Sequence, residues 1–406
     1  MNFFYVSDGL LKSLAKSGGY TAFTALVNYL MLAWLARSQE PLEFSAYLYN
    51  VSLALFAYLL IDLASEHTTS HSGSLKAKSL NIFTSRLLVI RFILLCVCTC
   101  VVIVSWWGGF IDDAYSIFLL LPALSMAGHF QASGKNVDFA RITLFEKLLF
   151  ILLTYFILTH GFKFEYIYFA FFLSTLISIL LQIQFFSFSV KGLIKNNFFE
   201  NYVRNYWPIY ILGIAQFTYG GLSRFFIEDS LGLLVFANFV MAYQIINIFA
   251  IFQRQVDRHF RPIVYSALAG VDPTTVIPII RFYCLFYLAP LLVMVGILIF
   301  FSNALFSTIY GENWPNGGVT LAYMAPLVFT IAIYRFCDNL MMGLAKTKAN
   351  LAISSFCSLF MIIIFLVAPP SWSIFEYVFF LVGTQILQVI LLIVFSFAAL
   401  RSRLYT

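Results

Sequence analysis

Residues 87–110 read LLVIRFILLCVCTCVVIVSWWGGF, and this stretch decides the fold. Arg91 is its single charged residue, and apolar side chains fill nearly all the remaining positions. A helix needs roughly 20 consecutive apolar residues to cross a hydrocarbon core about 30 Å thick. The stretch meets that length, and it therefore predicts a transmembrane helix.

The whole chain shares this apolar character. Of its 406 residues, 62% are hydrophobic and 10% are charged, whereas soluble domains carry about 25% charged residues. Mean hydropathy is +0.91. So few charges cannot cover a water-exposed surface, and the composition predicts an integral membrane protein. It argues against a cytosolic enzyme, a nucleic-acid-binding module and a secreted disulfide-linked domain.

Windows of similar length recur along the chain, bounded by charges or by turn residues. The fifth window is the weakest, because Glu146 and Lys147 interrupt its start. Together the windows predict twelve transmembrane helices, at 18–36, 44–63, 87–110, 114–131, 142–160, 164–187, 206–226, 232–252, 279–303, 318–340, 349–369 and 374–400.

The connections between these helices repeat a rhythm of lengths. A long connection after the second span matches a long one after the eighth, and short connections follow the fourth and tenth spans. This rhythm indicates an all-α polytopic protein of two pseudo-symmetric six-helix bundles. We expect an N-terminal lobe at 1–190, a basic cytoplasmic linker at 191–205 and a C-terminal lobe at 206–406. Two lobes with a cleft between them are typical of transporters.

The distribution of positive charge predicts the orientation. Most of the 24 Lys and Arg residues fall on connections that share one side of the membrane if the N-terminus is cytoplasmic. Arginine and lysine concentrate on the cytoplasmic side of membrane proteins. The net charge of +6 therefore reports topology, and we expect a multi-pass protein with both termini in the cytoplasm.

Catalytic and cofactor motifs are missing from the sequence. The five histidines form no helical pair, and no nucleophile elbow or phosphate-cradling Gly-Lys loop occurs. The cysteines lie inside apolar runs without the spacing of a metal site. We therefore expect no catalytic residues, no metal, no cofactor and no nucleic-acid partner. The protein is predicted not to be an enzyme.

Charges within a span are functional candidates, because a charge at the bilayer centre costs about 2.5–3.5 kcal/mol on insertion scales. Arg224 lies near the end of the seventh span, in a run that also holds Gln216 and two glycines. It either extends to the outer headgroups or faces the cleft and contacts an anionic substrate. Arg91 either reaches the inner interface or contributes to the same substrate site.

Arg335 and Asp338 lie three residues apart in the tenth span, and so they share one helical face. They form either a self-neutralising pair or groups that exchange partners during transport. Neutral polar residues mark spans that face an aqueous path or bind neighbouring helices. Asn28 in the first span and Asn247 in the eighth complete the candidate substrate-binding set.

Three short segments resemble one family of transporters. They are YGENW at 310–314, GLAKTK at 343–348 and LKSLAKSGG at 11–19. With the twelve-span layout, they resemble the polysaccharide transporters of the multidrug/oligosaccharidyl-lipid/polysaccharide exporter superfamily. The resemblance implies a MATE-like two-lobe fold in a bacterial inner membrane.

Within that superfamily, the resemblance points to O-antigen or capsular repeat-unit flippases. It implies that the protein carries an undecaprenyl-pyrophosphate-linked oligosaccharide across the inner membrane by alternating access. The implied partners are the lipid-linked oligosaccharide, membrane lipids, a polysaccharide polymerase and chain-length proteins of lipopolysaccharide biosynthesis. Aromatic residues, 19% of the chain, either stack on sugars or populate the membrane interfaces.

Two other functions remain alternatives at this point. A sugar polymerase or ligase of the same pathway is also polytopic, but such enzymes carry a sizeable outer loop, and every predicted outer loop here is short. A drug or cation antiporter on the same fold needs interior carboxylates in the N-terminal lobe. Only Asp62 and Glu146 come near that position, both at span edges.

Overall fold

The computed structural model describes residues 8–63, 65, 77–108, 114–186, 198–270, 281, 285, 288–344 and 346–405. Within these ranges the chain consists of helices and turns, with no strand. The all-α prediction is therefore confirmed for the described residues. Residues 191–197 of the predicted linker and residues 271–280 lie outside these ranges.

The chain divides into two compact units. The first comprises Met1–Leu32 and Asn50–Tyr210, and the second comprises Ala33–Tyr49 and Ile211–Thr406. The hairpin that ends the first helix and starts the second thus belongs to the second unit. The lobe boundaries given above remain a prediction.

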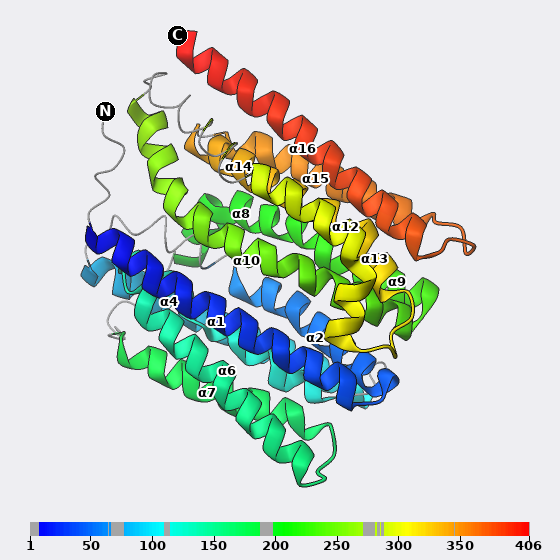
Figure 1. Ribbon diagram of the computed structural model, residues 1–406. Helices are drawn as coiled ribbons and strands as arrows, with labels where there is room; N and C mark the ends of the chain where they lie inside the picture. Colours follow the sequence, from blue (N-terminus) through cyan, green and yellow to red (C-terminus); the bar gives the residue numbers. More distant parts are fainter. Residues whose placement is uncertain are drawn as a thin grey trace. The chain divides into compact units, whose positions relative to one another are not determined.

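Short turns join α1 to α2 and α6 to α7 in the first half. Figure 1 shows α6 and α7 as neighbouring helices, and α7 also packs against η2. The elements are α1 (Asp8–Ser38), α2 (Pro41–Asp62), α4 (Ala77–Trp107), η2 (Ala114–Leu124), α5 (Ala127–Ala132), α6 (Asn136–Thr159) and α7 (Tyr166–Gln184).

The second half packs its helices around α10 and α14. In that half α10 contacts α9, α13 and α14, while α16 contacts α13, α14 and α15. The elements are α8 (Phe198–Phe217), η4 (Thr218–Leu222), α9 (Ser223–Leu231), α10 (Leu233–Gly270), α12 (Ala289–Tyr310), α13 (Gly317–Met324), α14 (Pro326–Gly343), α15 (Thr347–Leu366) and α16 (Ile374–Tyr405).

Ten helices of the described chain are long and apolar enough to cross a membrane. They correspond to ten of the twelve predicted spans, so the protein is a multi-pass membrane protein. The interrupted fifth window forms one continuous helix, α6. Its Glu146 carboxylate lies 3.0 Å from Lys147 Nζ and accepts a hydrogen bond from Thr175 at 3.3 Å. Local pairing of the two charges explains why they do not break the helix.

The other two predicted spans differ from the prediction, because neither is a regular α-helix throughout. Window 114–131 forms the 3-10 helix η2 with Pro122 inside it, then a break, then the short helix α5. Proline has no N–H to donate within a helix. Window 206–226 forms α8, a π-helical turn at η4 and α9. The π turn contains Gly220 and Gly221.

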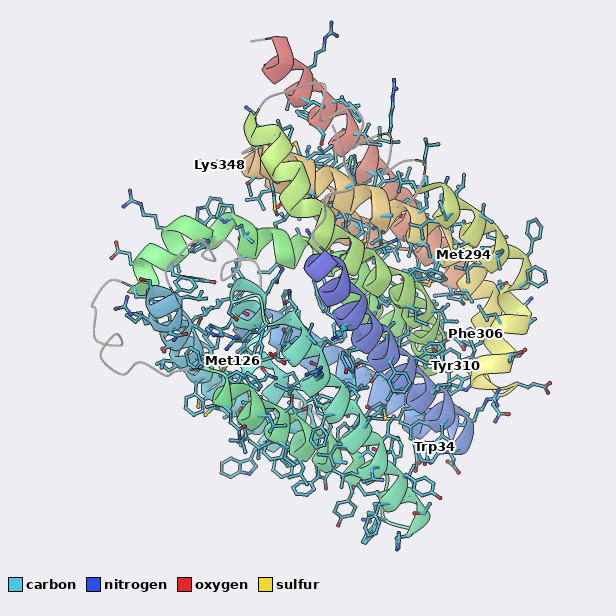
Figure 2. The ribbon with its side chains drawn as sticks, turned by 60° about the vertical axis from the view of Figure 1, so that its left-hand side comes forward. Trp34, Met126, Met294, Phe306, Tyr310 and Lys348 are labelled. Atoms are coloured by element: carbon cyan, nitrogen blue, oxygen red, sulfur yellow. The ribbon has the colours of Figure 1, made fainter. Side chains whose placement is uncertain are left out.

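Burial separates the lipid-facing helices from those of the core. Few residues in the apolar length of α4 are buried, whereas more than half of Leu233–Ala250 in α10 and of Gly317–Gly343 in the pair α13–α14 are buried. In the second unit, Phe306 and Tyr310 project from α12 with ring centroids 4.9 Å apart (Figure 2). The α12 helix continues to Tyr310, past the predicted end at 303, and stops at Gly311, whose φ of +90° favours glycine.

Candidate functional site

Arg224 is the buried cation of the second unit. It is the second residue of α9, directly after the π turn, and 7% of it is exposed. Its guanidinium carbon lies 5.1 Å from the ring centroid of Tyr243 on α10. Extension to the outer headgroups, one of the two predicted roles, is wrong because the side chain is enclosed. This cation–π contact stabilises the cation in its apolar surroundings.

The π turn before Arg224 depends on its glycines. A Cβ at Gly220 would overlap the hydroxyl and ring of Tyr243, and one at Gly221 would overlap the ring of Phe217. The close approach expected at these glycines therefore occurs, and its partners are aromatic side chains. Single π turns inside helices occur frequently at functional sites.

A chain of amides and hydroxyls in the second unit links side chains from α8, α14, α15 and α16. Gln216 Nε2 on α8 donates a hydrogen bond to the Tyr334 hydroxyl on α14. Across from α14, Ser354 Oγ on α15 donates to Asn350 Oδ1 at 3.3 Å. Gln388 Nε2 on α16 donates to Ser354 Oγ at 2.8 Å. Such groups bind hydroxyl-rich ligands as well as neighbouring helices.

Asp338 joins this polar chain one helical turn after Tyr334. It is buried, and its Oδ1 accepts a hydrogen bond from Asn350 Nδ2. Arg335, on the same helix, is half-buried. Of the predicted residues, Gln216 and Asp338 are therefore brought into one polar cluster through α14. Both predicted roles of Arg335 and Asp338, as a self-neutralising pair or as groups that exchange partners during transport, stay predictions.

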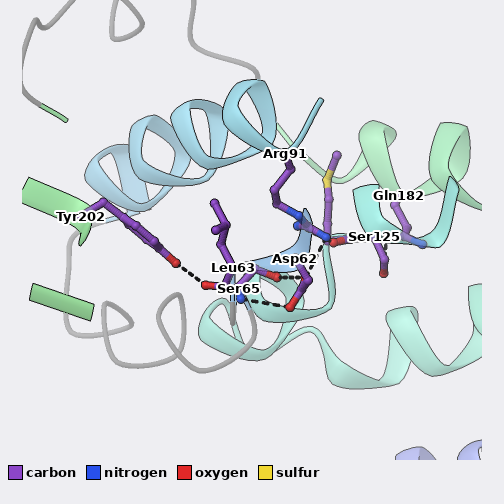
Figure 3. A network of polar contacts seen from close by, with 8 residues as sticks. Asp62, Leu63, Ser65, Arg91, Ser125, Gln182 and Tyr202 are labelled. Atoms are coloured by element: carbon purple, nitrogen blue, oxygen red, sulfur yellow. Dashed lines mark hydrogen bonds and ion pairs between the residues drawn. The ribbon is translucent and has the colours of Figure 1, made fainter. Parts of the chain in front are cut away.

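Arg91 lies in the first unit and has a carboxylate partner (Figure 3). Its Nη2 lies 2.9 Å from Asp62 Oδ1, and its Nη1 donates to the Ser125 carbonyl at 2.9 Å. Asp62 is in turn bonded by Ser65. The side chain of Arg91 is 3% exposed, so the predicted extension to the interface is wrong. Asp62, which the sequence places at a span edge, neutralises the Arg91 cation.

The break between η2 and α5 is held by side chains from two neighbouring helices. Arg91 binds the Ser125 carbonyl, and Gln182 Oε1 on α7 accepts from the Met126 N–H at 2.7 Å and from Ser125 Oγ at 3.4 Å. Backbone groups that leave a helix inside a membrane need partners within the protein. Arg91 and Gln182 supply these partners, and so the fourth span can be discontinuous.

We expect Gln182→Leu to destabilise the protein by about 1–3 kcal/mol, because it leaves the buried Met126 N–H without an acceptor. Gln184→Leu is the matched control, since Gln184 ends the same helix and is exposed. The midpoint of thermal unfolding in detergent measures both. Equal midpoints for the two variants would show that Gln182 does not hold the break.

The remaining predicted residues belong to different units. Asn28 is half-buried on α1 in the first unit, and Asn247 is half-buried on α10 in the second. Sequence reasoning missed Tyr243, Tyr334 and Gln182. A signal existed for Gln182, which is one of two amides in the last turn of a largely apolar helix. The two tyrosines carry no such signal, because tyrosine is common throughout this chain.

The fold and these buried polar groups define a multi-pass helical membrane protein with interior sites. Protein-family models give no match to the chain, and neither do curated protein sequences. Solved structures do match. A multidrug resistance MATE family transporter of the MOP superfamily in an outward-facing conformation aligns at TM-score 0.71 and 13% identity, over 97% of each chain.

Two further structures extend this similarity. The inward-facing conformation of such a transporter aligns at TM-score 0.70 and 13% identity, over 94% of this chain and 96% of that one. A MOP superfamily transporter from Pyrococcus furiosus aligns at TM-score 0.69 and 13% identity, over 97% and 94%. The protein therefore has the MATE-type transporter fold, and the predicted fold class is confirmed.

Proposed function

We propose that this protein is a flippase that moves an undecaprenyl-pyrophosphate-linked oligosaccharide across the bacterial inner membrane by alternating access. The fold supports a transporter, since solved relatives in fold are described in both outward-facing and inward-facing conformations. A transporter of this kind has no catalytic residues and needs no cofactor. Its termini are proposed to lie in the cytoplasm, and a polymerase and chain-length proteins are proposed as partners.

The observation that carries the proposal is the enclosed guanidinium of Arg224. An arginine in an apolar span is costly, and such residues mark substrate paths by default. Guanidinium binds phosphate oxygens through paired N–H donors, which suits a diphosphate group. Arg335 lies in the same unit, and the chain of amides and hydroxyls in that unit offers groups for sugar hydroxyls.

The proposed substrate-binding set also includes Arg91, Asn28 and Asn247, whose expected contributions differ. Arg91 is already neutralised by Asp62, so it contacts an anion only if that ion pair opens. Asn28 and Asn247 are neutral and would contact the oligosaccharide. Arg224 and Asp338 are the members whose loss we expect to matter most.

A drug or cation antiporter is the second candidate. It is favoured by the fold likeness to multidrug resistance transporters and by the buried carboxylate of Asp338. The Pyrococcus furiosus protein is described as having a binding pocket of reverse polarity that suggests a different function. One fold thus hosts sites of opposite charge, and the buried cation here favours an anionic substrate.

The test is deletion of the gene in the bacterium that produces the protein, followed by complementation. We expect lipid-linked repeat units to accumulate on the inner leaflet, and wild type to return them to the surface. Arg224→Ala should lower translocation roughly tenfold to a hundredfold, as expected for losing charge-assisted hydrogen bonds worth about 1.5–3 kcal/mol. Arg141→Ala, which removes an exposed cation, is the control.

Other outcomes separate the alternatives. Unpolymerised repeat units on the outer surface would indicate a polymerase or ligase. Normal surface polysaccharide together with increased drug sensitivity would indicate an antiporter. Full translocation by Arg224→Ala at normal protein level would remove Arg224 from the site.

A further inference from the structure

We propose that Tyr243 is a positioning residue whose ring, seated on Gly220, holds the Arg224 guanidinium for the anionic group of the substrate. The inference rests on the proposed function, and both Tyr243 and Gly220 act through Arg224. It concerns only contacts within the second unit, where α8, η4, α9 and α10 follow one another in the chain.

The position of the Tyr243 ring depends on the absence of a side chain at Gly220. Gly220 is buried, and Tyr243 lies so close to it that any Cβ would strike the hydroxyl and the ring carbons. The ring therefore occupies the space that a side chain at 220 would fill. Any larger residue must push Tyr243 away from this position, because two ring carbons as well as the hydroxyl make the contact.

The same ring then faces Arg224. The guanidinium carbon of Arg224 stands 5.1 Å from the ring centroid, within the range of a cation–π contact. Tyr243 also stacks on Phe239, one turn earlier on α10, with centroids 6.2 Å apart and planes 18° apart. The ring is held by Gly220 and by Phe239, and it in turn limits the positions open to the cation.

Stacking constrains the guanidinium in a way that suits anion recognition. A ring covers a face of the guanidinium, whereas its N–H donors lie in its plane and point outward from its edge. A phosphate or pyrophosphate binds at such an edge through two parallel hydrogen bonds. A guanidinium held in one orientation loses less freedom on binding, and so the ring strengthens binding without touching the ligand.

The test uses the full-length protein in lipid nanodiscs and undecaprenyl pyrophosphate as the probe, with Kd as the readout. We expect Tyr243→Leu to weaken binding about tenfold through loss of the ring. Tyr243→Phe keeps the ring and should bind within about twofold of wild type. Gly220→Ala should weaken binding about tenfold although it changes neither the cation nor the ring.

Two further variants make the test specific. Gly383→Ala is the matched control, since Gly383 lies in the helix α16 and no atom stands within 4 Å of the place where a methyl group would sit. Gly220→Ala combined with Tyr243→Ala should bind no more weakly than Tyr243→Ala alone, because the added methyl group then meets no ring. Each variant is first checked to be monodisperse and to unfold at the wild-type thermal midpoint. If Gly220→Ala alone does not fold, the double substitution still tests the contact.

The outcomes separate this inference from the proposed function. Loss of binding in Arg224→Ala, Tyr243→Leu and Gly220→Ala, with binding kept in Tyr243→Phe, supports it. Loss in Arg224→Ala alone, with Tyr243→Leu and Gly220→Ala like wild type, overturns the positioning role and leaves the proposed site standing. Unchanged binding in Arg224→Ala overturns both. Additive losses in the double variant overturn the contact between Gly220 and Tyr243.

Discussion

Asp62→Ala is expected to destabilise the protein by about 3–5 kcal/mol, because it leaves the Arg91 cation buried without its carboxylate. Arg91 is 3% exposed and Asp62 is 14% exposed, so water cannot replace the lost partner. The denaturation midpoint of the purified protein in mixed micelles measures the change. The size of this effect distinguishes a buried ion pair from a pair at the membrane surface.

The double substitution Asp62→Leu with Arg91→Leu should cost less than Asp62→Ala alone. Replacing both members of a buried ion pair by apolar side chains removes the charge together with its compensation, which is often neutral. Arg91 also binds the Ser125 carbonyl, however, and the double variant leaves that acceptor without its donor. We therefore expect a residual loss of about 1–3 kcal/mol.

Arg141→Ala provides the control for a surface pair. Arg141 lies 3.8 Å from Asp138, and the side chains are 54% and 36% exposed. Exposed pairs of this kind contribute about 0.2–1 kcal/mol. If Asp62→Ala shifts the midpoint no more than Arg141→Ala does, water reaches the Arg91 pair and the buried network described above is wrong.

The sequence alone predicts the helices well, because transmembrane length and apolar composition are properties of single segments. Ten windows correspond to segments long and apolar enough to cross a membrane, including the one that Glu146 and Lys147 interrupt. Local signals mark the departures from a regular α-helix. They are Pro122 in the fourth window, Gly220 with Gly221 in the seventh, and Pro326 after the turn that separates α13 from α14 in the tenth. Proline and paired glycines commonly disturb helices.

The partners of the buried charges could not be predicted in the same way. Arg91 pairs with Asp62, and Arg224 stacks on Tyr243 from a different helix. Helical periodicity places residues on a face of their own helix, but it carries no information about which face of another helix lies opposite. The sequence therefore indicates no partner for either arginine, whereas Arg91 is bound to a carboxylate and Arg224 lies over an aromatic ring.

The second unit contains a reciprocal contact between two turns. Trp314 follows α12, is 4% exposed, and donates its Nε1–H to the Ala36 carbonyl at 3.2 Å near the end of α1. Arg37 in turn donates to the carbonyls of Thr308 and Ile309 in the last turn of α12. The last carbonyls of a helix have no partner within it, so each turn supplies donors to the end of the other helix.

Trp314→Ala is expected to destabilise the protein by about 3–5 kcal/mol, the usual range for removing a large buried aromatic side chain. The loss should concentrate in Ala33–Tyr49, which belongs to the second unit. Trp314 also packs edge-to-face on Phe44 of that segment, with ring centroids 5.8 Å apart. Amide hydrogen exchange should therefore increase in 33–49 before it increases elsewhere in the second unit.

Trp107→Ala is the matched control, since Trp107 ends α4 and is 87% exposed. Surface substitutions usually change stability within about 0.5 kcal/mol, so exchange in 33–49 should stay at the wild-type rate. Faster exchange spread evenly over the whole chain in Trp314→Ala would instead mean general loosening. In that case the reciprocal contact does not hold the hairpin, and the membership of 33–49 in the second unit needs another cause, such as the hydrogen bonds of Arg37.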